Sequence, residues 1–184
     1  MSDNLAGMLL VAVPHMLDPN FARSVVLVCD HSESGALGLI INRPTKAMVA
    51  DYLPDWTQLV VEPGVVFEGG PVQRDVAIGL AGLAADQQAP EGFAAIAMGL
   101  GLLDLDSDPA SAFDLGGLRV FSGYAGWEPG QLEAEIVEGG WFVVPLQPGD
   151  GLVENPERLW SRVLARQGGR LAVYATFPPN PGLN

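Results

Sequence analysis

Apolar residues in the first third of the chain fall into three nearly continuous runs. Met8–Val13 and Ser24–Asp30 are rich in Val and Leu, a composition typical of strands that are covered on both faces. Residues 36–41 form the third run, and the turn-forming segment 31–35 that precedes it predicts an antiparallel hairpin. The pattern therefore predicts a meander over residues 8–42 whose first two strands are central in the sheet.

Shorter apolar runs follow, separated by turn-forming residues. They predict strands at 65–68, 75–81, 94–98, 102–105, 118–124 and 141–145, and a strand or extended segment at 171–177. Strands run consecutively and helices occur at irregular intervals. The pattern therefore favours an α+β fold with a curled, mixed and largely antiparallel sheet, with a doubly wound fold as the alternative.

Capping residues and prolines mark the predicted helix boundaries. Asn155 and Pro156 begin the clearest helix, which ends before Gly168. Thr45 is predicted to cap a short helix that runs to Leu53. Further starts are predicted at Asp18-Pro19 for one turn through Arg23, at Asp108-Pro109, and over residues 130–138.

Composition narrows the class of protein. The 184 residues are 48% hydrophobic and 17% charged, which predicts one domain over residues 1–184 with one core. No apolar stretch reaches membrane-spanning length, and Cys29 is the only cysteine, so we expect a cytoplasmic protein without membrane contact. The net charge of −13 repels polyphosphate, so no direct nucleic-acid binding is expected.

Polar residues that flank the first apolar strands are candidates for a ligand site. They are Asp18, Arg23, Asn42, Arg43 and Thr45. Sites often assemble at such strand ends. If these side chains converge on a pocket, the protein is an enzyme of the hydrolase or nucleotide-acting type; if they do not, they are structural.

Two other groups of reactive residues lie close together in the sequence. Ser24, His15 and Asp18 resemble the members of a nucleophilic triad, but no nucleophile elbow surrounds Ser24 and Asp18 has a sufficient role as a cap. Cys29 and His31 face the same side if the strand extends that far. A buried Cys29 and a turn residue at 31 are the favoured interpretation. No histidine spacing or cysteine cluster supports a metal site, and no catalytic residue or cofactor is predicted.

The few cations gather near the C-terminus. Arg158, Arg162 and Arg166 recur every four residues, and Arg170 follows. A row of phosphate contacts is one interpretation, but a solvated helix face paired with acidic residues is favoured. For the glycine-rich turn around Trp127 we likewise favour packing over anion binding, because no lysine follows it.

Several ordered motifs carry a family resemblance. They are Gly7-x-Leu9-Leu10-x-Ala12-x-Pro14-x-Met16-x-Asp18-Pro19-x-Phe21-x-Arg23-Ser24-Val25, Gly35-Ala36-x-Gly38-Leu39, Asn42-Arg43-Pro44-Thr45, Gly69-Gly70-Pro71-Val72, Gly123-Tyr124-Ala125-Gly126-Trp127-x-Pro129-Gly130-Gln131-Leu132-Glu133 and Asn180-Pro181-x-Leu183-Asn184. In this order they resemble the bacterial YqgE/AlgH family over essentially the whole chain.

The resemblance implies a mixed α/β structure whose bifurcated sheet curls into a pseudo-barrel with flanking helices. Family members carry a proposed role in transcriptional regulation, with no established catalytic residues or cofactor. The resemblance and the acidic charge together favour a regulatory or binding module that acts without direct DNA contact. Its partner is expected to be a protein or a small molecule.

Overall fold

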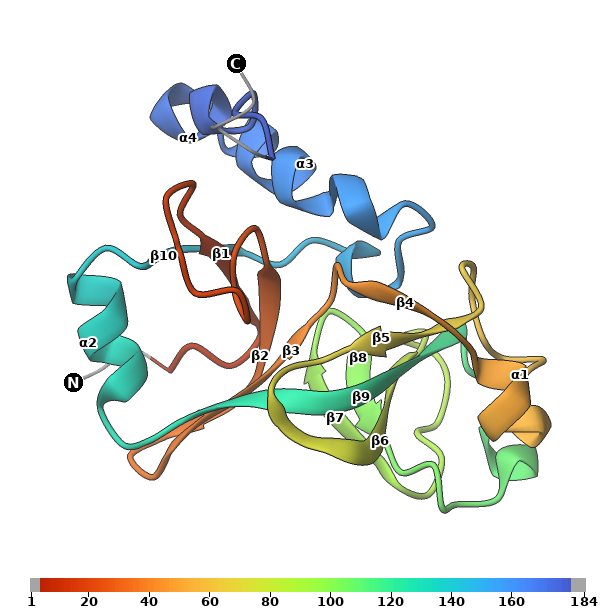
Figure 1. Ribbon diagram of the computed structural model, residues 1–184. Coiled ribbons are helices and arrows are strands. Elements are labelled where there is room, and N and C mark those ends of the chain that lie inside the picture. Colours follow the sequence, from red (N-terminus) through yellow and green to blue (C-terminus); the bar gives the residue numbers. More distant parts are fainter. Residues whose placement is uncertain (1–3, 180–184) are drawn as a thin grey trace.

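Residues 4–179 are described by the computed structural model, and their strands join into one curled sheet (Figure 1). The strands are β1 Met8–Ala12, β2 Val25–Ser32, β3 Gly35–Ile40, β4 Pro44–Met48, β5 Val65–Glu68, β6 Val72–Gly82, β7 Phe93–Ala97, β8 Leu100–Leu103, β9 Gly117–Trp127 and β10 Trp141–Pro145. Their order is β10-β1-β2-β3-β9-β6-β8-β7, with β4 and β5 branching from β9. Of these pairings only β5 with β9 is parallel, so the predicted α+β class and curled, largely antiparallel sheet are confirmed.

Short helices cover the sheet and join its strands. The α-helices are α1 Val49–Tyr52, α2 Gln131–Val137, α3 Leu159–Gln167 and α4 Gly169–Tyr174. Turns of 3₁₀ helix lie at Pro54–Trp56, Pro109–Ala112, Asp150–Leu152 and Pro156–Arg158. No helix in residues 4–179 is long and apolar enough to cross a membrane.

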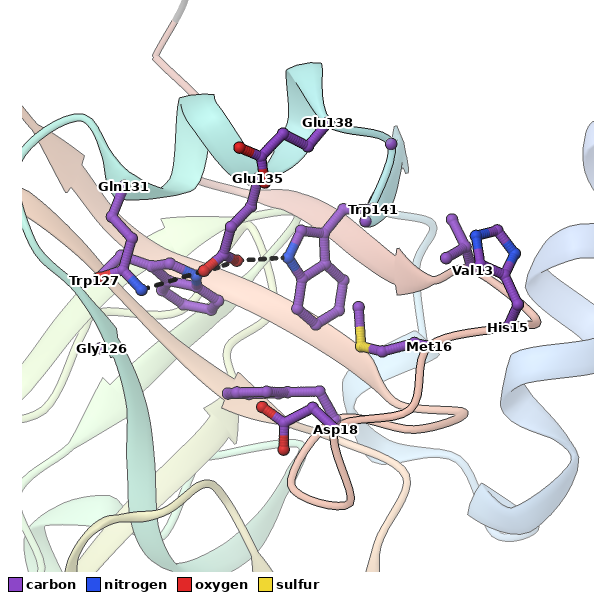
Figure 2. Close-up of a pocket in the computed structure, with 13 residues that line it drawn as sticks. Val13, His15, Met16, Asp18, Gly126, Trp127, Gln131, Glu135, Glu138 and Trp141 are labelled. Atoms are coloured by element: carbon purple, nitrogen blue, oxygen red, sulfur yellow. Dashed lines mark hydrogen bonds between the residues drawn. The ribbon is translucent and has the colours of Figure 1, made fainter.

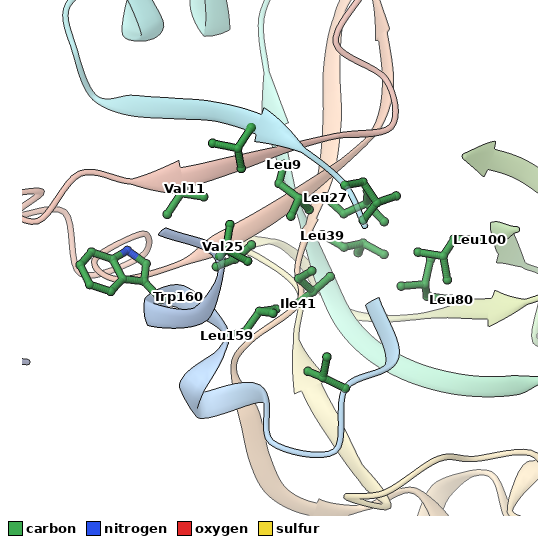
Figure 3. Packing of buried hydrophobic residues seen from close by; sticks show 14 of the residues in the cluster. Leu9, Val11, Val25, Leu27, Leu39, Ile41, Leu80, Leu100, Leu159 and Trp160 are labelled. Atoms are coloured by element: carbon green, nitrogen blue, oxygen red, sulfur yellow. The ribbon is translucent and has the colours of Figure 1, made fainter. Parts of the chain in front are cut away.

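The β10-β1-β2-β3 half of the sheet is buried on both faces. On one face, alternate residues of β1 and β2 such as Leu9 and Leu27 pack with Leu159 and Trp160 of α3 (Figure 3). On the other face, the intervening residues pack with Leu132 of α2. This double coverage is the physical reason for the continuous apolar runs in these strands.

The sheet divides at β9, where two strands follow the same edge. β3 pairs with the end of β9 at Trp127, and β5 runs parallel to β9 at Phe121. Gly69 lies at this fork, and a Cβ atom on it would stand 2.2 Å from the carbonyl oxygen of Gly123. A side chain cannot fit there, so the Gly69-Gly70 motif permits the close approach of the two backbones.

The segment after Asn42 differs from its prediction. It continues as β4, and only Val49–Tyr52 is helical. The Thr45 hydroxyl donates a hydrogen bond to the carbonyl oxygen of Val66 on β5 and accepts one from the N–H of Ala47. Thr45 therefore ties β4 to β5, and the prediction of a helix capped by Thr45 is wrong.

The C-terminal prediction of a strand at 171–177 is also wrong, because this segment begins as α4. Leu171, Tyr174 and Ala175 all pack against the core, and their spacing is that of a helix face. The ring of Tyr174 stacks on that of Phe142 with centroids 5.6 Å apart. The motif at 180–184 lies outside the described residues.

Two predicted caps have different outcomes. The Asp108 side chain accepts a hydrogen bond from the N–H of Ala110 and begins a 3₁₀ turn, as predicted. Asn155 makes no side-chain capping bond, and the 3₁₀ turn at Pro156 leads into α3. The fixed φ angle of Pro156 is therefore the start signal that operates there.

Candidate functional site

A pocket of about 400 Å³ lies where the loop after β1 meets the connection from β9 to β10 (Figure 2). The loop contributes His15, Met16, Asp18 and Phe21. The other wall comes from the end of β9, from α2 and from the start of β10. Residues 13–21 and 126–141, which are far apart in the sequence, thus form one concave surface.

Two tryptophans bracket the β9-α2-β10 connection. Trp127 is the last residue of β9 and Trp141 is the first of β10. Between them α2 ends in a Schellman motif: the N–H of Gly140 bonds to the carbonyl oxygen of Glu135, and the N–H of Gly139 to that of Ile136. Gly139 has a φ of 81°, which favours glycine. This reversal brings the second tryptophan back beside the first.

The carboxylate of Glu135 is the polar centre of the pocket. One of its oxygens accepts hydrogen bonds from the indole N–H groups of Trp127 and Trp141, each at 2.9 Å (Figure 2). The other oxygen accepts one from the amide of Gln131 at 3.0 Å. The Gln131 carbonyl oxygen in turn accepts the N–H of Glu128. The orientation of this carboxylate is therefore fixed by three donors.

Phe21 completes an aromatic cluster with the two tryptophans. Its ring centroid lies 6.1 Å from that of Trp127 and 5.5 Å from that of Trp141. The two indole rings are 6.2 Å apart and nearly perpendicular. Such offset and edge-to-face arrangements are the favoured geometries of aromatic pairs. The cluster therefore forms a rigid wall.

The lining of the pocket carries a negative charge. Asp18, Glu135 and Glu138 all line it, whereas no arginine or lysine does. His15 is the one residue of the lining that can carry a positive charge. None of the ion pairs within residues 4–179 includes any of these carboxylates. In the view of Figure 2, Asp18 and Glu135 lie on opposite sides of the indole rings.

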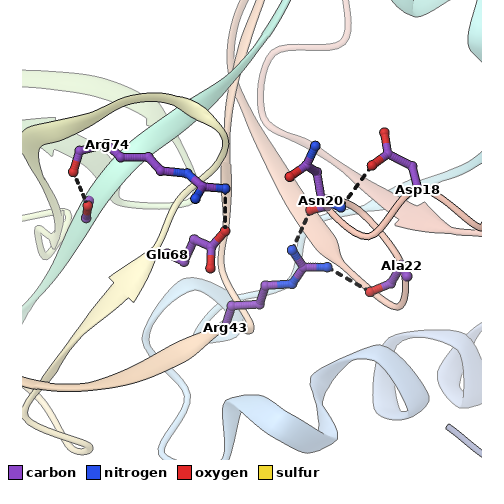
Figure 4. Close-up of polar contacts among 7 residues, drawn as sticks. Asp18, Asn20, Ala22, Arg43, Glu68 and Arg74 are labelled. Carbon is purple, nitrogen blue, oxygen red and sulfur yellow. Dashed lines mark hydrogen bonds and ion pairs between the residues drawn. The ribbon is translucent and has the colours of Figure 1, made fainter.

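The loop that carries Phe21 is held by hydrogen bonds to its backbone (Figure 4). The Asp18 side chain accepts the N–H of Asn20 at 2.9 Å, as predicted for a cap, but residues 19–23 form a hydrogen-bonded turn and not a helix. The guanidinium of Arg43 donates to the carbonyl oxygens of Asn20 and Ala22. Burial lowers the pKa of Arg43 from its ordinary value, and Glu68 and Asp18 oppose that shift.

Asn42 and Arg23 fix the end of the same loop. The buried Asn42 amide accepts the N–H of Val25 at 2.8 Å and donates to the carbonyl oxygen of Arg23 at 2.9 Å. The guanidinium of Arg23 lies 3.9 Å from the ring centroid of Trp160 and donates to the carbonyl oxygen of Phe177. The Asn42 side chain therefore holds the backbone of the loop, whereas the Arg23 side chain binds the segment at Phe177.

The five polar residues proposed as a ligand site are therefore only partly brought together. Asp18, Arg23, Asn42 and Arg43 surround one loop, while Thr45 lies on β4. Of the five, only Asp18 lines the pocket described above. A ligand-binding role for the whole set stays a prediction.

The pairing of Cys29 with His31, which the sequence did not favour, does not form. The favoured packing of Cys29 in the core agrees with the structure, but His31 lies within β2 and is not a turn residue. A β-bulge lies between Val28 and Asp30, and it shifts the alternation of β2 by one residue. Cys29 therefore keeps the α3 face that Leu27 also occupies, and the bulge moves His31 to the opposite face. Burial raises the pKa of its thiol to about 12, so it is unreactive near neutral pH.

His31 instead anchors α2 from the other face of the sheet. Its Nδ1 accepts the N–H of Leu5 at 3.0 Å, so the neutral ring carries its proton on Nε2, which lies 2.9 Å from the carboxylate of Glu133. A hydrogen bond from its own backbone N–H, and then that from His31, lower the pKa of Glu133. The two histidines serve different regions, and residues 4–179 contain no cluster of three metal-ligating side chains.

The remaining candidates have structural positions. Ser24 is fully buried and is not among the residues of the pocket that His15 and Asp18 line. Arg166 forms a two-point ion pair with Asp150 at 2.7 Å, which agrees with the acid-paired face favoured for this helix. Arg158 and Arg162 are exposed.

Sequence reasoning did not identify Glu135, Trp141 or Phe21 as site residues. Their convergence depends on the reversal after α2 and on the pairing of β1 with β10. One signal was available: two tryptophans separated by a short helix that contains a glutamate. A second cavity of about 550 Å³, between β4, β6 and β9, is mainly apolar, and its polar lining consists of Thr45, Tyr52, Arg74, Asp75 and Ser122.

Comparison with known proteins agrees with this architecture. A model of the AlgH-like family matches residues 9–172. The chain is also 52% identical over 185 residues to the UPF0301 protein SCO2948 of Streptomyces coelicolor, covering 98% of this chain and 96% of that protein. The chain therefore belongs to the AlgH-like family, and the resemblance seen in its motifs is confirmed.

Two solved structures share the fold. The crystal structure of protein DIP2367 from Corynebacterium diphtheriae superimposes with a TM-score of 0.86 at 35% identity, covering 94% of this chain and 92% of that one. The solution structure of the AlgH protein from Pseudomonas aeruginosa gives 0.71 at 31% identity, covering 97% and 96%. The curled sheet is thus shared with experimentally solved relatives.

Proposed function

We propose that this protein is a cytoplasmic binding module with a regulatory role, and that it acts through contacts at the pocket formed by Phe21, Trp127, Glu135 and Trp141. The observation that carries the proposal is the convergence of an aromatic wall and an oriented carboxylate on one concave surface. Aromatic walls with a few placed polar groups are typical of binding sites.

The chemistry of the lining favours binding over covalent catalysis. No serine, threonine, cysteine or lysine is among the residues that line this pocket, so it offers no hydroxyl, thiol or amine nucleophile. The arginines of the alternative enzyme hypothesis are engaged elsewhere, since Arg23 and Arg43 donate to backbone carbonyls. These contacts support a module that recognises a partner.

The net charge of −13 supports a regulatory role without direct DNA contact. A gel-shift assay with duplex DNA near physiological salt tests this part of the proposal. We expect no retained complex. Tight, sequence-dependent binding of the duplex would overturn it.

Site-specific photo-crosslinking tests the binding role of the pocket. Benzoylphenylalanine replaces His15 at the pocket, and as a control it replaces Phe113, which is 74% exposed and is not among the pocket residues. We expect a discrete crosslinked species in the native cell from position 15 and none from position 113. Identical patterns from the two positions would count against the pocket as the binding surface.

A further inference from the structure

We propose that the pocket binds a guanidinium group, as found in an arginine side chain. The inference rests on the proposed function and adds the chemical class of the ligand. It depends on three features of the pocket: carboxylates without an arginine or lysine in the lining, an aromatic wall, and the direction of the two indole N–H groups.

The negative charge of the pocket is balanced only in part by the protein itself, because Arg43 acts on Asp18 from outside the lining. Asp18, Glu135 and Glu138 line it without an arginine or lysine. The three donors on Glu135 are neutral indoles and an amide, so they orient the carboxylate and leave its charge uncompensated. Glu135 is the half-buried carboxylate of the three, so its interaction with an incoming cation is the one that water screens least.

The aromatic cluster presents a surface that attracts cations. The positive edge of an indole is its N–H, and in Trp127 and Trp141 this group is bonded to Glu135. Both indoles are almost fully buried against Phe21, so what the cluster offers the pocket is the carbon edges of the indoles and the half-buried ring of Phe21. The face of an aromatic ring carries the negative lobe of the quadrupole and attracts cations.

A guanidinium fits this combination better than an ammonium. It is planar, weakly hydrated and able to stack on an aromatic ring while its edge donates to carboxylates. The protein already places two of its own guanidinium groups over aromatic rings, with backbone carbonyls as their acceptors. Arg23 lies 3.9 Å from the ring centroid of Trp160, and Arg119 lies 4.3 Å from that of Phe67.

A peptide titration tests the inference. Acetylated Gly-Gly-Arg-Gly-Gly is titrated into the full chain, and binding is followed by tryptophan fluorescence and calorimetry. Matched peptides carry citrulline, which keeps the shape and removes the charge, or lysine. We expect the citrulline peptide to bind about tenfold or more weakly and the lysine peptide several-fold more weakly than the arginine peptide. Equal affinity for arginine and citrulline, or equal or tighter binding of lysine, would overturn the proposal.

Two glutamates of α2 provide a matched pair of variants. Glu135→Gln removes the charge inside the pocket, whereas Glu133→Gln removes the same charge at the site bonded to His31. We expect about a tenfold loss of affinity for the first and less than about a twofold change for the second. Equal losses would mean that only the overall charge matters. Asp18→Asn keeps the acceptor for the loop and is the second pocket variant if Glu135→Gln does not fold.

The source of the guanidinium is distinguished by agmatine, which carries the same group without a peptide. Binding of agmatine as tight as that of the arginine peptide supports a small-molecule ligand. Tighter binding of the peptide supports an arginine on a protein partner. If no probe binds at millimolar concentration while crosslinking at position 15 still captures a partner, the guanidinium inference fails and the binding role of the pocket stands.

Discussion

The loop after β1 has two sides that use polar chemistry differently. On one side, Asn42 and Arg43 are bonded to its backbone. On the other side, Phe21 and Asp18 line the pocket opposite Glu135. The first side fixes the loop, and the second presents side chains that still have capacity for a ligand. One carboxylate oxygen of Asp18 accepts a backbone N–H, so a polar residue beside a strand is a better site candidate when the backbone uses only part of its hydrogen-bonding capacity.

Asn42→Ala tests the first side most severely. It leaves the buried N–H of Val25 and the carbonyl of Arg23 without their partner, so we expect a loss of about 3 kcal/mol in the free energy of unfolding. The midpoint temperature of thermal unfolding should fall by roughly 6 to 12 °C. Asn20→Ala is the control, because it removes an amide side chain from the same loop and none of these bonds. A loss in the control equal to that in Asn42→Ala would contradict the assigned role.

Arg43→Ala should cost less, about 2 kcal/mol, since it removes two bonds at a less buried position. It should also loosen the loop and weaken binding at the pocket. Hydrogen exchange at the amides of Phe21, Ala22 and Ser24 measures this directly. Arg43→Lys should raise the exchange rates by an intermediate amount. Unchanged exchange rates in both variants would contradict the role of Arg43 in ordering the loop.

Glu135→Gln should lower the free energy of unfolding by about 1 kcal/mol, because an amide can replace the carboxylate as acceptor for the indoles but presents a donor to Gln131. Its main effect should be on ligand affinity. Urea unfolding and the emission maximum of the tryptophans check the two effects separately. A stability loss as large as that of Asn42→Ala would place Glu135 among the structural residues.

The pH dependence of stability should report on Glu133. Its pKa in the folded protein is lowered, so the unfolded state binds more protons as the pH falls. The stabilisation is complete above the unfolded value of about 4.5 and is lost as the pH falls through the folded value. Since its side chain is 34% exposed, the effect should be small. Urea midpoints of Glu133→Gln between pH 6 and 3 should fall less steeply than those of the unmodified protein. A slope that the substitution leaves unchanged would contradict the assignment.

Asp18→Asn should change the free energy of unfolding by less than about 0.5 kcal/mol, because asparagine keeps the oxygen that accepts the N–H of Asn20. It should still weaken binding of a cation. Calorimetric titration of the arginine peptide alongside thermal unfolding measures both effects. A large loss of stability would place Asp18 with the structural side of the loop.

The fold was predictable where burial dictates the residue pattern. The Val-rich runs of β1 and β2 indicated double coverage because both faces of these strands are packed. The prediction of a strand or extended segment at 171–177 failed because Val, Tyr and Phe have high strand propensity. Its packing against the core nevertheless makes α4 a helix, and the helical spacing of Leu171, Tyr174 and Ala175 was the competing signal.

The site was less predictable because its geometry is tertiary. A one-residue bulge separates Cys29 from His31, and no residue type at that position reveals it. Glu135 meets both indoles only because α2 reverses at Gly139 and β10 returns beside β1. The bond of Asp18 to the loop backbone could be predicted from local spacing alone, because sequence patterns are reliable for residues a few positions apart.

The pairing of β1 with β10 places Met8 opposite Pro145. The long stretch of sequence between these two residues has a consequence for folding kinetics. Closing so long a stretch of chain costs entropy before any contact repays it, and proteins rich in such distant pairings fold in milliseconds to seconds. Phe21 and Trp141 lie on either side of this closure. The binding surface therefore forms only when this long-range pairing closes.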